Sequence, residues 1–240
     1  MNSSRLPNKV LVDIGGIKSL DCQIQRMRKS KFIDEIVLAT TVNKSDDELE
    51  KFAEKNKLPI HRGSENDVMS RILEAAQLVN GDLQVQITGD CPLIDPTIID
   101  QVIDVYLKGN GIYDFVSNEI IRSYPIGLDC RVFPVEILAN AEKICKDPIH
   151  RMHGSTYIYV GEGRESNVCK NVYAPKKLRH PEFRWTLDEM EDLKFIKKVI
   201  KHFNKRFTEF SAVELMNWLK KNPEVIEINS NVIQKNIEEG

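Results

Sequence analysis

The sequence lacks any run of apolar residues long enough to cross a membrane and any closely paired cysteines. A membrane-spanning helix needs about 18 consecutive apolar residues, and the first nine residues, Met1 to Lys9, are polar and basic, unlike a signal peptide. The five cysteines are scattered, without a C-x-x-C pair, which disfavours a zinc knuckle or a disulfide framework. We therefore expect a cytoplasmic protein from a reducing compartment, without a membrane partner.

An excess of charge is also missing. The 34 Lys and Arg residues nearly balance the 36 Asp and Glu residues, which gives a formal net charge of -2. No broad basic field is available for nucleic acid, so any anion must be bound locally. A chain of 240 residues with 41% hydrophobic residues can bury a sizeable core. We predict one domain over residues 1–240, with an inserted β flap at 113–160.

Short apolar runs alternate with longer amphipathic segments, which is typical of an α/β fold with a mostly parallel sheet. Between residues 113 and 133 the strand-like pieces are broken by turns, which indicates an excursion from the main sheet. Strands are predicted at residues 36–39, 59–61, 83–88 and 184–187. Helices are predicted at 46–57 and 211–221, and from residues 64, 96, 134 and 189 onward.

The N-terminal segment begins directly with a loop-like stretch, residues 2–9. A nucleotide-binding α/β sheet normally opens with a strand that leads into the phosphate loop, and here that strand is not found before the loop. The small polar residues, Arg5 and Lys9 could surround a polyphosphate with backbone N–H groups and positive charge. A solvated basic tail is the alternative interpretation.

Two aspartates follow predicted strands. Asp90 lies in a Gly-Asp-Cys-Pro turn after the strand at 83–88, and Asp188 follows the strand at 184–187. The carboxyl ends of parallel strands meet at one edge of a sheet, where α/β proteins bind ligands. Mg²⁺ prefers one or two carboxylates together with phosphate oxygens and water. The pattern predicts a magnesium site made by Asp90 and Asp188.

Two other polar segments are candidates for ligand contacts. Residues 61–67 end a strand and open a helix, which is a ready site for an anion or a ribose. Arg71 lies one helical turn beyond Asp67 and either faces the same ligand or forms an ordinary helix-surface pair with it. His150 and His153 flank Arg151, but no carboxylate or cysteine completes a zinc site, so substrate contact or helix capping is favoured.

Taken together, these segments resemble the cytidylyltransferase family that includes spore-coat polysaccharide biosynthesis protein F. The CMP-sialate and CMP-KDO synthetases are more distant relatives. The resemblance covers nearly the whole chain in family order, and the combination of motifs is more specific than any one of them. The matching segments are residues 3–11, 39–41, 62–68, 87–95, 114–118, 124–129 and 184–188.

The resemblance implies a Rossmann-like, three-layer α/β/α nucleotidyltransferase sandwich. It implies magnesium-dependent transfer of CMP from CTP to an acidic sugar or phosphorylated precursor in surface glycan biosynthesis, with release of pyrophosphate. The flap would also form a homodimer contact. By the same resemblance, the catalytic residues are Arg5, Lys9 and Asp90, and the metal ligands are Asp90 and Asp188. The nucleotide-binding residues are Ser4, Arg5, Lys9, Thr40, Arg62, Ser64, Arg71 and Thr88, and the acceptor-binding residues are Asn118, Tyr124, Asp129, Arg151 and His153.

The sequence departs from the family pattern in two places. The first strand of the family is absent, and because such a strand is central and buried, we expect the natural protein to carry about ten further residues upstream. Met152 stands where the family has a glutamate between Arg151 and His153. Two alternatives remain: a metal-dependent glycosyltransferase, although Asp90-Cys91-Pro92 is not the usual Asp-X-Asp pair, and a non-catalytic nucleotide-binding subunit.

Overall fold

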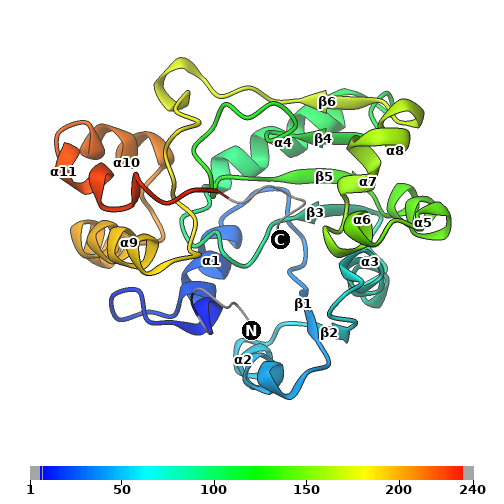
Figure 1. Cartoon of the computed structure of the whole chain (residues 1–240), viewed down its shortest axis with the longest axis horizontal. Coiled ribbons are helices and arrows are strands. Elements are labelled where there is room, and N and C mark those ends of the chain that lie inside the picture. The colour runs from blue at the N-terminus through cyan, green and yellow to red at the C-terminus, as the bar shows by residue number, and fades with distance from the viewer. Residues whose placement is uncertain (1–5, 7, 235–240) are drawn as a thin grey trace.

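The structure, a computed structural model, describes Leu6 and residues 8–234, and it alternates helices and strands along most of the chain (Figure 1). The strands are β1 (Leu38–Thr41), β2 (Ile60–Gly63), β3 (Leu83–Gln86), β4 (Phe115–Ser117), β5 (Arg131–Pro134) and β6 (Cys169–Asn171). The α-helices are α1 (Ser19–Met27), α2 (Asp47–Asn56), α3 (Val68–Leu78), α4 (Pro96–Lys108), α5 (Val135–Ile144), α6 (Pro148–Met152), α7 (Thr156–Tyr159), α8 (Gly161–Ser166), α9 (Met190–Phe203), α10 (Ala212–Leu219) and α11 (Pro223–Ile226). Short 3₁₀ helices are η1 (Lys9–Leu11), η2 (Lys44–Asp46), η3 (Lys176–Leu178), η4 (Asn204–Arg206) and η5 (Glu227–Asn229).

The strands form two separate sheets rather than one mostly parallel sheet. β1 and β2 pair in parallel, while β3, β5, β4 and β6 form a four-stranded sheet in that order. Within the larger sheet β5 runs antiparallel to both β3 and β4, and β4 runs parallel to β6. The prediction of a mostly parallel sheet is therefore wrong. Helical crossovers favour parallel neighbours, but β4 and β5 are joined by a loop that reverses the chain.

The larger sheet is covered by helices on both faces. Successive strand residues point to opposite faces, so Phe115 and Phe133 pack in one cluster while Val116 and Val132 pack in another. The first cluster includes residues of α3, α5 and α7, and the second includes residues of α4. This arrangement has the three layers, helix, sheet and helix, that the family resemblance implies.

Segment 113–160 contributes to this sheet. β4 and β5 are two of its strands, and the helices α5, α6 and α7 follow them. The expectation that this stretch leaves the main sheet is therefore wrong for the strands. The role expected of the segment in binding an acceptor or a second subunit stays a prediction.

Helix starts follow their capping residues. α4 begins at Pro96, as predicted, and the Asp95 carboxylate accepts the Thr97 N–H at 2.8 Å. α10 begins with the predicted capping box of Ser211 and Glu214. The helix predicted from Ser64 instead begins at Val68, because Asp67 is the residue that caps it by accepting the Ser70 N–H.

Two strand predictions differ most from the structure. β1 covers residues 38–41 rather than 36–39, a shift of two residues toward the predicted site. Residues 184–187 form no strand; Arg184 makes an isolated bridge with Ile126. Among the described residues, no helix is both long and apolar enough to span a bilayer.

Candidate active site

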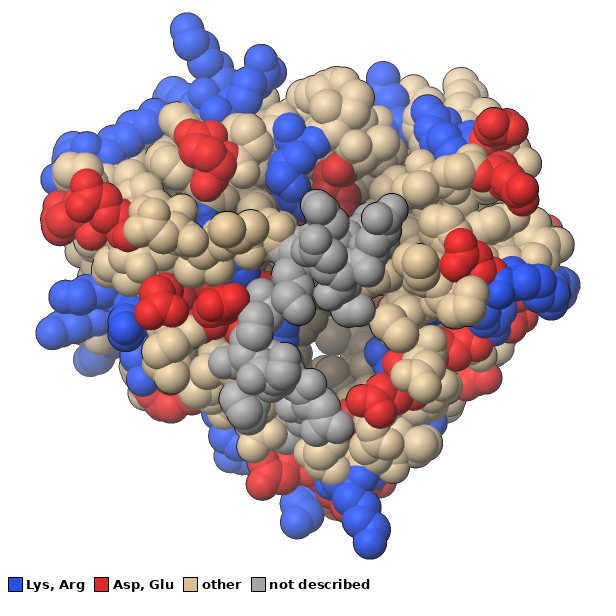
Figure 2. Space-filling view, viewed as in Figure 1, with Lys and Arg blue, Asp and Glu red and all other residues tan. Residues whose placement is uncertain are grey.

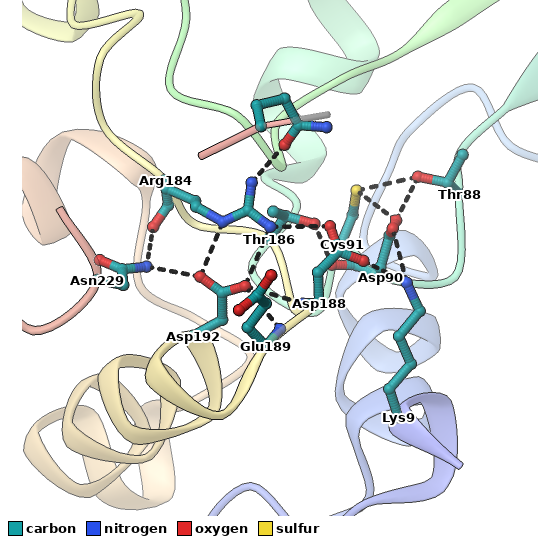
Figure 3. Close-up of polar contacts among 11 residues, drawn as sticks. Lys9, Thr88, Asp90, Cys91, Arg184, Thr186, Asp188, Glu189, Asp192 and Asn229 are labelled. Atoms are coloured by element: carbon teal, nitrogen blue, oxygen red, sulfur yellow. Dashed lines mark hydrogen bonds and ion pairs between the residues drawn. The ribbon is translucent and has the colours of Figure 1, made fainter. Parts of the chain in front are cut away.

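Lys9 brings the two predicted metal carboxylates together. Its Nζ lies 3.2 Å from Asp90 Oδ2 and 2.5 Å from Asp188 Oδ1, although the three residues come from distant parts of the sequence (Figure 3). Asn8 precedes η1 with φ at 56°, a left-handed conformation that asparagine tolerates, and its carbonyl accepts the Leu11 N–H. This turn aims Lys9 at the end of β3.

The loops that carry Asp90 and Asp188 are bonded to each other through the backbone. The Asp90 carbonyl accepts both the Thr186 hydroxyl and the Leu187 N–H, each at 2.9 Å. Thr88, just beyond β3, donates its hydroxyl to Asp90 Oδ1 at 2.5 Å. These contacts fix the separation of the two carboxylates without a direct bond between them.

Asp188 is supported by a buried network that the sequence did not point to. Arg184, which is 5% exposed, donates to Asp188 Oδ2 at 2.8 Å and to Asp192 Oδ1 at 2.9 Å. Asn229 in turn donates to Asp192 at 3.0 Å (Figure 3). The spacing of Arg184 and Asp188 was a usable signal, but it was hidden by the prediction of a strand at 184–187.

Lys9 and Asp90 favour each other's charged forms. Burial opposes the charged form of Asp90, but the Lys9 ammonium and the hydrogen bonds from Thr88 and Lys9 outweigh it, so the pKa of Asp90 is lowered. Burial likewise disfavours the charged form of Lys9, yet the charges of Asp90 and Asp188 raise its pKa. Burial raises the pKa of the neighbouring Cys91 thiol well above its usual range, which favours its protonated form.

The donor set fits a magnesium ion that is completed by substrate. A single ammonium group contacts both carboxylates, which shows that one cation can reach Asp90 and Asp188 at the same time. The described residues contain no group of three or more His, Cys, Asp or Glu side chains that could hold a metal by themselves. Two carboxylates with space for phosphate oxygens and water are what Mg²⁺ uses in nucleotide-dependent enzymes.

A cleft of about 500 Å³ opens beside this site. Lys9, Thr88 and Gly89 line its end next to the carboxylates, and β1 and β3 line it along their length. Thr40 and Arg71, two predicted nucleotide contacts, also line the cleft. The structure therefore brings Lys9, Thr40, Arg71 and Thr88 to one cavity.

Other predicted nucleotide residues are engaged elsewhere or lie outside the described residues. Ser4 and Arg5 fall outside them. Arg62 donates to Asp47 at 2.8 Å and to Glu50 at 2.7 Å, and so connects β2 to α2 rather than facing the cleft. The Ser64 hydroxyl accepts the Asp67 N–H at 3.1 Å. The Thr40 hydroxyl donates to Asp46 at 2.6 Å.

Three of the predicted acceptor residues have partners of their own; Asn118 and Tyr124 are buried and Asp129 is partly buried. Asn118 donates to the Leu128 carbonyl and accepts the Cys130 N–H, so its amide holds the loop before β5. The Tyr124 hydroxyl donates to Gln101 at 3.1 Å. Asp129 pairs with Arg122 at 2.7 Å, and burial together with the charge of Glu119 raises the pKa of Asp129. Asn118 and Tyr124 therefore hold the surrounding structure, whereas Asp129 lies near enough to Cys91, the neighbour of Asp90, for its charge to raise the pKa of that thiol.

The last two acceptor candidates lie on or next to α6. Arg151 donates to Asp67 at 2.5 Å and to Glu142 at 2.8 Å, so it connects α6 to the start of α3 and to α5. The Asp67–Arg71 pair expected as the alternative is replaced by this contact and by a bond from Arg71 to the Ser64 carbonyl at 2.7 Å. His153 is partly buried at the end of α6.

Comparison with known proteins supplies the family. A family model described as Cytidylyltransferase matches residues 1–146. An uncharacterised protein of Methanocaldococcus jannaschii, MJ1063, is 35% identical over 99% of this chain and 94% of its own length. The spore coat polysaccharide biosynthesis protein SpsF of Bacillus subtilis is 30% identical over 93% of this chain and 92% of its own. The chain belongs to the cytidylyltransferase family. Its enzyme class is therefore that of the nucleotidyltransferases.

Solved structures agree with this assignment. A cytidylyltransferase from Leptospira borgpetersenii is 34% identical, with a TM-score of 0.88 over 98% of this chain and 95% of its own. A CMP-2-keto-3-deoxy-manno-octonic acid synthetase solved with CTP is 14% identical, with a TM-score of 0.60 over 84% of this chain and 95% of its own. The second likeness shows that this cytidylyltransferase has the α/β nucleotidyltransferase fold, but with a mixed sheet among its described strands.

Proposed function

We propose that this cytidylyltransferase transfers CMP from CTP to an acidic sugar or a phosphorylated precursor, with release of pyrophosphate, in the biosynthesis of a surface glycan. The observation that carries the proposal is the position of the Lys9 ammonium between the Asp90 and Asp188 carboxylates at the end of the cleft. A cation site next to a lysine suits a polyphosphate substrate, since both charges can offset the phosphates.

The reaction is an in-line displacement at the α-phosphorus of CTP. An acceptor oxygen forms the new bond to this phosphorus, the bond from phosphorus to the α,β-bridging oxygen breaks, and its electron pair leaves with pyrophosphate. A hydroxyl acceptor gives its proton to water, whereas a carboxylate or phosphate oxygen carries none. Asp90 and Asp188 would hold magnesium, which supplies charge neutralisation of the phosphates when bound. The Lys9 ammonium, which lies against both carboxylates in this structure, would then be available to contact phosphate oxygens.

The rest of the site acts by positioning. Thr88 fixes one oxygen of Asp90, and Arg184 fixes one oxygen of Asp188, so the other two oxygens face Lys9. Such pre-formed geometry removes the cost of ordering these groups during the reaction. The acidic sugar acceptor is proposed by analogy with relatives such as the 3-deoxy-manno-octulosonate cytidylyltransferase of Chlorobium phaeobacteroides, which is 35% identical over 45% of this chain and 43% of its own. A homodimer is proposed on the family resemblance alone.

The test measures magnesium-dependent pyrophosphate release from each of the four NTPs with a panel of 2-keto-3-deoxy sugar acids and sugar phosphates. Mass spectrometry identifies the product. Release from CTP with a CMP-linked product, and none from the other three, is expected. Asp104→Asn is the matched control for the Asp90→Asn variant described in the Discussion. Asp104 is also a carboxylate, but it lies on α4 and pairs with Lys108 at the surface. Preferential release from UTP or ATP would contradict the assignment of CTP.

A further inference from the structure

The segment after α11 returns to the candidate active site. In Figure 1 the chain leaves α11 at one end of the molecule and runs back toward its centre, and the short helix η5 follows α11 directly. The last residue of η5, Asn229, is 3% exposed and lies beside Arg184 and Asp192 in Figure 3. A residue late in the chain therefore enters the network that holds Asp188.

The Asn229 side chain joins two points of the segment that carries Asp188. Its Nδ2 donates to the Arg184 carbonyl at 2.8 Å and to Asp192 Oδ1 at 3.0 Å. Arg184 lies four residues before Asp188, and Asp192 lies four residues after it. One amide nitrogen, which carries two hydrogens, thus connects both ends of the stretch in which the carboxylate stands.

This stretch has no regular structure of its own around Asp188. Residues 185–189 belong to no helix or strand, so no ladder of backbone bonds sets the direction of the side chain. The Asp188 N–H donates to Asp192 Oδ2 at 2.9 Å, and the Arg184 guanidinium donates to Asp188 Oδ2 at 2.8 Å. The backbone and the carboxylate of Asp188 are therefore both held by the two residues that Asn229 connects.

The groups that Asn229 connects are buried charges. Acidic and basic side chains are interspersed over the exposed face in Figure 2, whereas Arg184 and Asp192 are 5% and 0% exposed. Arg184 Nε and Nη2 both donate to Asp192, and Nη1 donates to Gln234. A buried polar group that loses its partner costs free energy. Loss of the Asn229 amide would remove a donor from each end of the segment and favour a shift of Arg184 and Asp192.

We propose that Asn229 is a positioning residue for Asp188, because it holds Arg184 and Asp192 in the arrangement that directs Asp188 Oδ1 toward the Lys9 ammonium. Asn229 acts through these two neighbours and not by contact with the reacting groups. This role rests on the metal site proposed above for Asp90 and Asp188. Residues that support a metal ligand typically change metal affinity by about 10- to 100-fold when they are removed.

This support comes from a part of the chain that the family model does not cover. The model matches residues 1–146, which contain Lys9 and Asp90. Asp188, its partners Arg184 and Asp192, and Asn229 all lie beyond residue 146. The second half of the chain thus supplies one carboxylate of the pair together with the residues that hold it.

The test measures Mn²⁺ binding in the presence of CTP by electron paramagnetic resonance. It compares the unaltered chain with Asn229→Ala, Asp188→Asn and the double variant. Asn229→Ala is expected to raise the Kd for Mn²⁺ about tenfold. In the Asp188→Asn background the same change should alter the Kd by less than about twofold, because the carboxylate that Asn229 positions is then absent. A residue that only anchors η5 would lower Tm without this dependence on Asp188.

Asn167→Ala is the matched control. The Asn167 amide also donates to two acceptors, the Ile158 carbonyl at 3.2 Å and the Gly163 carbonyl at 2.7 Å, but it follows α8 and has no bond to the Asp188 network. Asn167→Ala should lower Tm and leave Mn²⁺ binding unchanged. Asn229→Ser keeps one donor and should raise the Kd about threefold, so it answers the question even if Asn229→Ala does not fold.

The outcomes separate this role from the metal site on which it rests. Equal Kd values for the unaltered chain and both Asn229 variants, measured below their Tm, would overturn the proposal. A tenfold loss that persists in the Asp188→Asn background would also overturn it, since Asn229 would then act by another route. If Asp188→Asn leaves the Kd unchanged, the metal role of Asp188 fails together with this inference. A loss for Asp188→Asn without one for Asn229→Ala removes the inference alone.

Discussion

The four-stranded sheet is packed completely along the middle of β4 and β5 but incompletely along β3. In the four-stranded sheet Val116 and Val132 are fully buried, with 0% exposure. Val85 on β3 is a partner of Val132 across the ladder. The Val85 side chain is only partly buried because it lines the cleft beside the active site. The active site lies where the loop after β3 meets η1. Its carboxylates follow β3 or precede α9, and its lysine comes from η1, which packs with α1 near β1.

This difference separates groups that maintain the fold from groups that carry out the reaction. Asp90 and Asp188 are held in place by the buried residues Thr186, Arg184 and Asp192. Lys9 approaches from across the cleft. Changes at the two carboxylates should therefore lower the rate of the reaction with little effect on stability. Changes at buried residues of β4 and β5 should lower stability with little direct effect on the reaction.

The largest effect is expected for Asp90→Asn, which should lower pyrophosphate release by at least about a hundredfold. The substitution keeps the size of the side chain but removes one of two metal carboxylates. Thermal unfolding should stay close to that of the unaltered protein, because Asp188 still pairs with Lys9. Steady-state kinetics and calorimetry on the same preparation separate the two effects. Retention of a third or more of the activity would remove Asp90 from the catalytic residues.

A pair of valine substitutions compares β5 with β3, two neighbouring strands of the four-stranded sheet. Val132→Ala should reduce the free energy of unfolding by about 2 kcal/mol, because two buried methyl groups are lost and a cavity forms. Val85→Ala, the same change at the opposing position, should reduce it by less than about 1 kcal/mol, since the cleft already exposes that side chain. Urea unfolding measures both values. Equal losses would mean that β3 is packed as tightly as β5.

The pH dependence of stability tests the Lys9–Asp90 contact. The pKa of Asp90 is lowered in the folded protein, so its contribution is present above the unfolded value and is lost as pH falls through the lower, folded value. The pKa of Lys9 is raised, so its contribution is present below the unfolded value and is lost as pH rises through the higher, folded value.

Lys9→Met removes both contributions. It should cost about 1 kcal/mol of unfolding free energy at neutral pH, since the pair is only partly buried. It should also move the acid limb of the stability curve to higher pH, because Asp90 loses the charge that lowers its pKa. Urea unfolding from pH 3 to pH 10 checks both. An unchanged acid limb would show that Lys9 does not set the ionisation of Asp90.

The smallest effect is expected at the exposed surface of α4. Asp104 and Lys108 form a pair one helical turn apart on α4, with side chains 41% and 75% exposed. Asp104→Ala should lower the free energy of unfolding by no more than about 0.5 kcal/mol, and salt should reduce the difference. Urea unfolding at low and high salt measures it. A loss above 2 kcal/mol would show that burial near α4 was misjudged.

The sequence predicted that Asp90 and Asp188 lie together, but only Asp90 follows a strand as expected. Asp188 was placed at the end of a strand at 184–187 that does not form, and it reaches the site because Thr186 and Leu187 donate to the Asp90 carbonyl. Helix starts were predictable where a capping residue and a proline or a capping box coincide, as at Asp95 and Ser211. Local patterns of this kind depend on neighbouring residues alone.

Strand direction and buried polar partners were not predictable in the same way. The antiparallel placement of β5 depends on how the chain returns from β4, and no local pattern records it. Asn118 was assigned to the acceptor by the family resemblance, but its amide satisfies the backbone of Leu128 and Cys130. Arg184 was missed because its partners, Asp188 and Asp192, come together only when α9 is formed.

The most direct test of the site is the binding of Mn²⁺, as a substitute for magnesium, followed by electron paramagnetic resonance in the presence of CTP. The unaltered protein should bind one Mn²⁺ per chain together with CTP, and both Asp90→Asn and Asp188→Asn should weaken this binding, whereas Asp104→Asn should leave it unchanged. Equal Mn²⁺ binding by all four proteins would contradict the claim that Asp90 and Asp188 form the metal site.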